Sequence, residues 1–110
     1  MTQMPQKVVL ITAPEGIAEE LAKEIVEGHM AACVQVFAGG RSFFRWDGEV
    51  QAERESLLVC KTTSDRIDDL TRLMTLRHPY EVPELLVLPI ETGLPAYLAW
   101  MVEETSPFRT

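Results

Sequence analysis

The chain has 110 residues, of which 46% are hydrophobic, and a formal net charge of −7. This size favours a single domain over residues 1–110, with enough apolar side chains to form a core. The sequence contains no basic run, which argues against nucleic acid and anionic membranes as partners. Its longest apolar stretches have the length of a strand, so we expect none to span a bilayer.

The N-terminus and the cysteines bear on the cellular compartment. Residues 1–6 lack a basic region followed by an apolar core, and therefore do not resemble a signal peptide. The two cysteines, Cys33 and Cys60, are too few for a disulfide framework, and their spacing matches no zinc motif. We therefore expect a reduced, cytoplasmic protein.

The first half of the chain predicts a strand, a helix and a long hairpin. An apolar run predicts a strand over residues 7–12. Residues 14–29 predict a helix, because apolar side chains recur every four positions and glutamates fill the other side. Two strands over residues 31–46 and 50–62 are joined at Asp47-Gly48, a dipeptide typical of hairpin turns.

The second half predicts two helices around one more strand. Ser64 is expected to cap a helix over residues 64–76, and residues 85–91 predict the last strand. Gly93-Leu94-Pro95 then opens a C-terminal helix. The order β-α-β-β-α-β plus a helix is typical of an α+β, ferredoxin-like sandwich with both inner helices on one face of an antiparallel sheet. Pro89 places the last strand at an edge, where a missing N–H is tolerated.

The predicted hairpin is too long for the domain that carries it. Residues 50–62 would extend roughly 43 Å at about 3.3 Å each, whereas a compact domain of this length is roughly 34 Å across. We expect Gly39-Gly40 to bend or bulge the first arm, and the end that carries Phe43, Phe44 and Trp46 to project. Because exposed aromatic residues usually meet a partner, we predict a homo-oligomer in which hairpins pack against neighbouring subunits. The alternative is a hairpin that coils over its own sheet.

A stiff polar loop precedes the last predicted strand. Residues 78–84 read His-Pro-Tyr-Glu-Val-Pro-Glu, and the two prolines hold the backbone extended. A rigid loop that carries an imidazole, a phenol and carboxylates suits a binding site. The alternative is that the prolines only end a helix and direct a strand, with Tyr80 over the core and His78 in a hydrogen bond that orders the loop.

Cys33 is the candidate thiolate. If the Asp47-Gly48 turn sets the register and the glycine pair adds one bulged residue, Cys33 falls opposite or near Lys61. A neighbouring ammonium favours the thiolate, which selects copper(I) or zinc over magnesium or calcium. Lys61 could instead orient the site or bind an anionic ligand. Free cysteine is also a common core residue; this interpretation stays open for Cys33 and is preferred for Cys60.

Two glutamates on the long second arm of the hairpin predict charged contacts. Glu53 and Glu55 lie two apart and hence on one face of the strand. With Arg41 and Arg54 nearby, they favour intersubunit or cross-strand ion pairs, and a carboxylate-lined cation site is the second interpretation. The sequence has no Ser-His-Asp signature, P-loop or dinucleotide glycine motif, so we do not expect an enzyme.

Several short motifs, in their order and spacing, resemble the CutA divalent-cation-tolerance family. The similarity runs from about Val8 to Glu103 and is carried by Thr12-Ala13-Pro14, Met30-Ala31-Ala32-Cys33-Val34, Trp46-Asp47-Gly48, Lys61-Thr62-Thr63, His78-Pro79-Tyr80, Pro83-Glu84-Leu85 and Tyr97-Leu98-Ala99-Trp100. It implies a ferredoxin-like homotrimer whose strands extend the sheets of neighbouring subunits. This agrees with the hairpin argument, which does not depend on it.

The resemblance also implies a function. Family members are linked to tolerance of copper and other divalent metals, their trimers resemble PII-type signalling proteins, and no catalytic reaction belongs to them. Residues matching Cys33 and Glu84 are proposed to reach one metal-binding cleft. With His78, whose imidazole suits copper and zinc, the expected ligands are Cys33, His78 and Glu84, and neither metal is expected to be obligatory.

One position departs from the pattern of the family. Many relatives have a histidine just before His78, and this chain has Arg77, which would alter a metal site there or bind an anion instead. We expect Arg77, Lys61 and Tyr80 to line the cleft. The sequence therefore predicts a trimeric metal-binding protein. The alternatives are a PII-like sensor of a small molecule and a structural trimer that serves as a scaffold for another protein.

Overall fold

The computed structural model describes residues 4–106. Residues 1–3 and 107–110 lie outside the described residues. They include part of the N-terminal segment that does not resemble a signal peptide and both ends of the predicted domain. The elements in chain order are β1 (Gln6–Pro14), α1 (Glu15–Glu27), β2 (Cys33–Trp46), β3 (Glu49–Thr63), a 3₁₀ turn (Ser64–Arg66), α2 (Ile67–Arg77), β4 (Leu85–Pro89) and α3 (Pro95–Glu104). The predicted α+β, ferredoxin-like order is confirmed.

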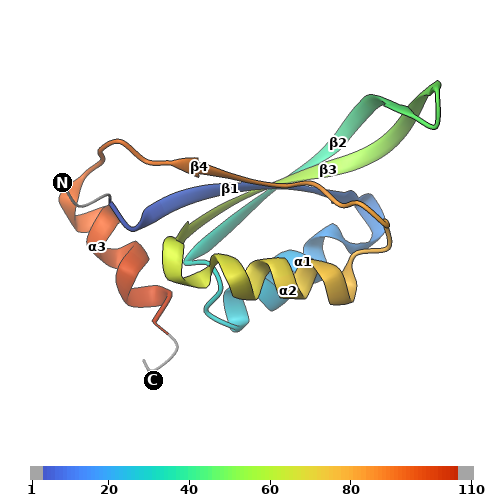
Figure 1. Cartoon of the computed structure of the whole chain (residues 1–110). Coiled ribbons are helices and arrows are strands. Elements are labelled where there is room, and N and C mark those ends of the chain that lie inside the picture. Colours follow the sequence, from blue (N-terminus) through green and yellow to red (C-terminus); the bar gives the residue numbers. More distant parts are fainter. Residues whose placement is uncertain (1–3, 107–110) are drawn as a thin grey trace.

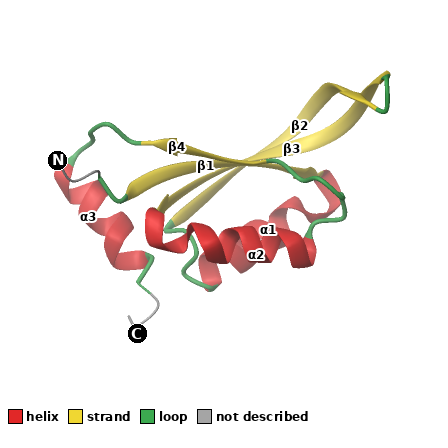
Figure 2. Cartoon of the chain, viewed as in Figure 1, coloured by secondary structure: helices red, strands yellow, loops and turns green. Residues whose placement is uncertain are grey.

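The four strands form one antiparallel sheet in the order β2-β3-β1-β4. β4 therefore lies at an edge, as Pro89 predicted. Helices α1 and α2 lie side by side under one face of the sheet, and α3 lies at the end where β1 begins (Figures 1 and 2). We call the sheet face that points away from α1 and α2 the outer face.

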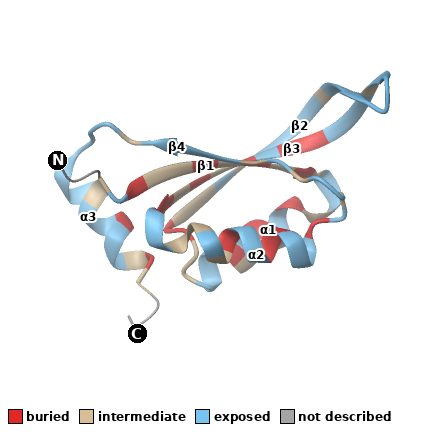
Figure 3. Ribbon diagram, in the orientation of Figure 1, coloured by how far each residue is buried: buried red, intermediate tan, exposed pale blue. Residues whose placement is uncertain are grey.

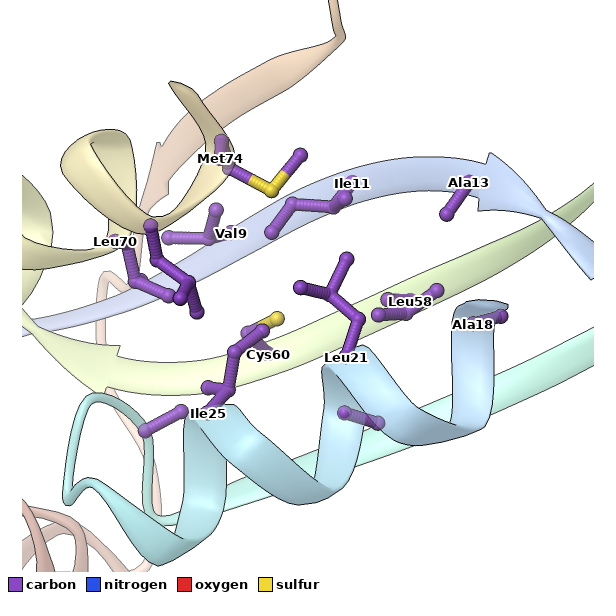
Figure 4. Packing of buried hydrophobic residues seen from close by; sticks show 13 residues of the cluster. Val9, Ile11, Ala13, Ala18, Leu21, Ile25, Leu58, Cys60, Leu70 and Met74 are labelled. Carbon is purple, nitrogen blue, oxygen red and sulfur yellow. The ribbon is translucent and has the colours of Figure 1, made fainter. Parts of the chain in front are cut away.

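The hydrophobic core lies between the sheet and the helices α1 and α2 (Figure 4). Alternate residues of β1 and β3 point toward the helices, and Val9, Ile11, Leu58 and Cys60 are fully buried. The apolar stripe of α1 meets them through side chains that include Leu21. Figure 3 shows the buried residues gathered where the sheet passes over the helices, whereas the end of the hairpin is exposed.

Most element boundaries differ from the prediction by one to three residues, and three of these differences involve a proline or Ser64. β1 continues to Pro14, which is the N-cap of α1 and not part of its first turn. The helix expected from Ser64 begins with the 3₁₀ turn, and α2 starts at Ile67 without a side-chain cap. β4 ends at Pro89, two residues early, because proline has no N–H with which to continue the ladder.

The hairpin projects beyond the helices, as predicted (Figure 1). Asp47 and Gly48 have φ angles of 52° and 80°, the left-handed pair that a two-residue hairpin turn of type I′ requires. The register of β2 on β3 shifts just before Gly40, and Gly39 there has a φ of 83°, which confirms the predicted bulge. A Cβ atom on Gly40 would lie 2.7 Å from the carbonyl oxygen of Glu55, so the two strands approach closely only because this residue is glycine.

The aromatic residues at the end of the hairpin are exposed in the single chain. Phe43 is 66% exposed, Trp46 is 51% exposed and Phe44 is 38% exposed. The alternative, a hairpin coiled over its own sheet, is therefore wrong. The long axis of the molecule measures 44 Å, longer than a compact domain of this size because the hairpin adds to it.

Candidate functional site

Cys33 lies directly opposite Lys61 in the ladder between β2 and β3, as the sequence predicted. The Lys61 ammonium donates to the side-chain oxygen of Gln35, two residues along β2 on the same outer face. Cys33 is partly buried and is not in a disulfide. Tyr97 of α3 is close by: burial raises the pKa of Tyr97, and the negative charge of a Cys33 thiolate raises it further. We call Cys33, Lys61, Gln35 and Tyr97 the thiol group.

The second cysteine has a different environment. Cys60 faces the helices and is fully buried in the core. Burial raises the pKa of the Cys60 thiol to about 12, and the nearby Cys33 adds to this. The prediction that Cys60 packs in the core is confirmed.

His78 holds the stiff loop in place. The ring is 8% exposed; its Nε2 donates to the carbonyl of Thr12 at 2.8 Å, and its Nδ1 accepts from the backbone N–H of Tyr80 at 3.2 Å. Together these bonds require a neutral ring with its hydrogen on Nε2. The rings of His78 and Tyr80 are also in contact, with centroids 4.7 Å apart. His78 thus orders the loop, and it could ligate a metal only by giving up one of these bonds.

Tyr80 connects the same loop to the base of the hairpin. Its hydroxyl lies close to the carboxylate of Glu55, which is only 6% exposed. Burial raises the pKa of Tyr80, and the interaction with Glu55 and the negative charge of Glu53 raise it further. Sequence reasoning assigned Glu55 to ion pairs and missed this contact. The signal was available, because Glu55 shares a strand face with Lys61 and hence points to the outer face.

Glu84 lies near Glu55 at the other end of the loop. Burial raises the pKa of Glu84, and the negative charge of Glu55 raises it further. Carboxylates that repel each other in this way favour a proton or a cation between them. We call Tyr80, Glu55 and Glu84 the carboxylate group.

The thiol group and the carboxylate group are far apart within one chain. Cys33 aligns across the sheet with Val8, whereas Glu84 directly precedes Leu85, which pairs with Ile11. This offset corresponds to about 13 Å along the strands and about 14 Å across three strand spacings. Within residues 4–106, the structure contains no group of three or more His, Cys, Asp or Glu side chains placed to hold a metal ion. The predicted set of Cys33, His78 and Glu84 stays a prediction, and it requires more than one subunit.

Arg77 lies apart from the carboxylate group. Its Nε donates to Glu24 of α1 at 3.2 Å, so the side chain joins the end of α2 to α1. The structure thus places the residue that departs from the family pattern in a contact between helices.

The charged residues of the hairpin do not form the cross-strand ion pairs that the sequence favoured. Arg41 lies opposite Arg54, and Glu53 lies opposite Ser42, so the arginines and the glutamates occupy opposite faces of the hairpin. Arg54 instead reaches Glu15 of α1 at 3.9 Å. The cross-strand interpretation is wrong, and the intersubunit interpretation remains.

Two surface hollows lie away from both groups. One, of about 310 Å³, lies against α2 and is lined by residues that include Arg66 and Leu76. The other, of about 380 Å³, lies between the end of β3 and α3. Neither is lined by Cys33, His78 or Glu84.

Comparison with known proteins identifies the family of this chain. The model of the CutA1 divalent ion tolerance protein family matches residues 7–104. The chain belongs to this family. It is 45% identical to the divalent-cation tolerance protein CutA of Thermus thermophilus over 101 residues, which are 91% of this chain and 98% of that protein. It is 39% identical to CutA of an Escherichia coli strain over 95 residues, which are 86% of this chain and 85% of that protein.

Solved structures of CutA proteins have the same fold. The T. thermophilus protein superposes with a TM-score of 0.89 at 44% identity, covering 92% of this chain and 99% of that chain. CutA1 from Oryza sativa gives a TM-score of 0.85 at 38% identity, and the superposition covers 92% of this chain and 94% of that chain. A protein from Nostoc described as PII-like CutA gives a TM-score of 0.87 at 32% identity, and the superposition covers 93% of this chain and 99% of that chain.

The CutA relatives are described in different compartments. The protein from Archaeoglobus fulgidus is described as periplasmic. The Arabidopsis thaliana relative is described as chloroplastic, and this chain spans 57% of its length. Between residues 4 and 106, the structure has no helix of the length and apolarity needed to cross a bilayer. The cytoplasmic location stays a prediction.

Proposed function

We propose that this protein is a homotrimeric metal-binding protein that acts in tolerance of divalent cations and copper, with copper or zinc bound between subunits. One observation carries the proposal. A free thiol and a group of carboxylates lie on the same outer face of the sheet, at a separation that a single subunit cannot bridge. Membership of a family named for divalent ion tolerance supports the role. The name describes tolerance and not a reaction, and we propose no catalysis.

The outer face supports assembly. Leu86 and Leu88 of β4 and Leu57 of β3 point to it and are 54%, 45% and 36% exposed. Phe44 and Trp46 of the hairpin lie on the same face and are also exposed, and exposed apolar side chains that gather on one face favour a partner. Packing outer faces together in a trimer would bury this surface. It would also bring Cys33 of one subunit toward the carboxylate group of another.

The residues fit the chemistry of the proposed ions. A thiolate from Cys33 suits copper(I) and zinc, and zinc also accepts carboxylate oxygens such as those of Glu84. His78 supports this site by fixing the loop that carries Glu84, and direct ligation through its ring would exchange the hydrogen bond from Tyr80 for a metal bond.

The test is a titration of metal-free protein with copper(I), and separately with zinc, against a competing chelator. The solution mass is recorded on the same sample. We expect a trimer that binds about one ion per subunit with sub-micromolar affinity. Cys33→Ser should weaken binding at least about tenfold, whereas Cys60→Ala, which changes the core thiol, should not. A trimer with only weak, non-stoichiometric binding would show that the role in tolerance is indirect.

A second candidate function is a PII-like sensor of a small molecule. It is favoured by the structural similarity to the protein from Nostoc that is described as PII-like. In this case the clefts between subunits would bind a nucleotide or metabolite, and calorimetric titration of the metal-free trimer would detect saturable binding. Tight binding of neither metal nor small molecule, with one protein that co-purifies, would favour a scaffold.

A further inference from the structure

The surface hollow against α2 has an apolar floor. We call this hollow of about 310 Å³ the α2 hollow. Its floor is continuous with the core, because Leu73 belongs to the buried cluster and Met30 packs against that cluster. Leu76 also lines the hollow and is 73% exposed, whereas the other exposed residues of α2 are polar. The hollow therefore offers an apolar surface that water covers in the single chain.

The rim of the α2 hollow carries two guanidinium groups and one carboxylate. The carboxylate of Asp69 is shared between them: its Oδ2 lies 2.9 Å from Arg66, and its Oδ1 accepts from Arg72 at 3.0 Å. Arg66 also donates to the carbonyl oxygens of His29 and Gly28, at 3.1 and 3.2 Å. Arg72 uses one nitrogen for Asp69 and its side chain is 69% exposed, so donors of its guanidinium remain for another acceptor. Two positive groups and one negative group leave the rim with a positive charge in excess.

The spacing of residues along α2 puts the charge beside the apolar surface. Asp69, Arg72, Leu73 and Leu76 follow one another at steps of three, one and three positions, and therefore lie on one face of the helix. Helix α2 lies under the sheet, on the side opposite to the outer face (Figure 1). A trimer that packs through outer faces would leave the α2 hollow open to solvent.

We propose that the α2 hollow binds a small apolar carboxylic acid. The apolar group of the acid would cover Met30, Leu73 and Leu76, and its carboxylate would pair with Arg72, whose planar fork of donors matches two carboxylate oxygens. The volume of about 310 Å³ is at the lower end of the range for small-molecule sites. It holds about ten non-hydrogen atoms if each takes the ~30 Å³ that a water molecule occupies in the liquid.

The same features select against other ligands. An apolar cation would meet the excess positive charge of the rim, and an inorganic anion would leave Leu76 uncovered. Cys33, His78 and Glu84 do not line the α2 hollow. The inference therefore goes beyond the proposed metal site and does not depend on it.

The test is an NMR titration of the full chain, with labelled methyl groups, by three probes. Phenylpropionate carries both features of the proposed ligand, phenylpropionamide has the same shape without the charge, and acetate has the charge without the ring. We expect the methyl signals of Met30 and Leu73 to shift saturably with phenylpropionate, with a dissociation constant of about 1 mM or less. The amide should bind about fivefold more weakly, and acetate should leave these signals unchanged.

Two variants separate the charged and apolar parts of the α2 hollow. Arg72 and Leu76 are both largely exposed, so neither Arg72→Gln nor Leu76→Ser should disturb folding. Arg72→Gln should weaken binding of phenylpropionate about fivefold and leave the amide unaffected. Leu76→Ser should weaken both about fivefold, because each loses the same apolar contact. Arg41→Gln on the hairpin removes an equal charge far from α2 and is the matched control.

Three results would overturn the inference. One is equal affinity of the wild type for phenylpropionate and its amide, and another is unchanged affinity of Arg72→Gln for phenylpropionate. The third is the absence of saturable shifts up to about 10 mM of probe. Because the α2 hollow and the outer face lie on opposite sides of the sheet, each of these results would leave the proposed metal-binding function intact.

Discussion

The hydroxyl of Tyr80 lies close to the buried carboxylate of Glu55, and this contact joins the loop before β4 to the base of the hairpin. The loop is also tied to β1, because His78 donates to the carbonyl of Thr12. Two of the residues that the sequence singled out therefore set the position of a third, Glu84. The loop and the hairpin should respond to mutation as one unit.

Removing the Tyr80 hydroxyl should destabilise the protein. Tyr80→Phe removes the polar hydroxyl beside the buried carboxylate of Glu55, and we expect a loss of about 1 to 2 kcal/mol in the free energy of unfolding. Urea denaturation followed by circular dichroism measures it. Tyr97→Phe, a change at a more exposed tyrosine, is the control. Equal midpoints for Tyr80→Phe and the wild type would show that this contact does not stabilise the fold.

The raised pKa of Glu84 gives stability a definite dependence on pH. A carboxyl group whose pKa is raised by folding contributes its full stability below its ordinary value of 4.5, and loses it as pH rises through the raised value. Glu84→Gln removes the charge, so it should be more stable than the wild type at pH 7, by less than about 1 kcal/mol because the site is partly exposed. The difference in stability between Glu84→Gln and the wild type should become smaller as the pH falls toward 4.5.

The same change tests the cause of the shift. In a background of Glu55→Gln, the stabilising effect of Glu84→Gln should shrink, because Glu55 supplies part of the repulsion. Denaturation curves at several pH values measure both effects. If the difference in stability between Glu84→Gln and the wild type grows as the pH falls, the pKa of Glu84 is not raised by folding and this explanation is wrong.

The close approach at the bulge should depend on glycine. Gly40→Ala places a Cβ 2.7 Å from the carbonyl oxygen of Glu55, and we expect it to cost about 1 to 3 kcal/mol of stability. Gly16→Ala is the matched control, because a Cβ there meets nothing within 4 Å. Urea midpoints compare the two. Similar midpoints for both variants would show that the strands can separate without penalty.

Because Arg77 contacts Glu24, we expect Arg77 to affect the stability of the protein and not its affinity for metal ions. Arg77→Gln should lower stability by about 1 kcal/mol or less, as expected for an exposed ion pair between helices. It should leave the affinity for copper or zinc unchanged, since the side chain points to α1. A clear change of metal affinity in the chelator competition would place Arg77 in the site after all.

The two cysteines should differ in reactivity. Burial, with a pKa raised to about 12, keeps Cys60 protonated and covered, so alkylation of the native protein at pH 8 should modify at most one thiol per chain. Both should react in denaturant. Mass spectrometry of the labelled peptides measures this. Labelling of Cys60 at the same rate as Cys33 would mean that the core opens readily.

Most of the fold could be predicted because its signals are local. The Asp47-Gly48 turn and the glycine pair place Cys33 opposite Lys61 by simple pairing of residues along two strands. The boundary near Ser64 could not be predicted in the same way. Serine there is compatible with a helix cap and with a 3₁₀ turn, and the choice depends on packing around the buried Thr63.

The arrangement of the candidate site could be predicted less completely from the sequence. The ligand-type residues were visible, but their distances depend on which strands lie next to each other in the sheet. That order separates Cys33 on one edge strand from Glu84 beside the other. The role of Arg77 was also hidden, because its partner Glu24 is 53 positions away in the chain. Contacts between helices that are distant in sequence leave no short-range pattern.

The place of β1 in the sheet has a consequence for synthesis of the protein. β1 lies between β3 and β4, and Val8 pairs on one side with Lys61 and on the other with Leu88. A nascent chain that has completed β3 must still add the segment up to Leu85 before β4 can pair, which takes roughly 1 to 4 seconds at about 5 to 20 residues per second. During that interval the apolar strand β1 has one unpaired edge on the ribosome, where it can pair with a second nascent chain. Slower translation between β3 and β4 should therefore lower the yield of soluble protein.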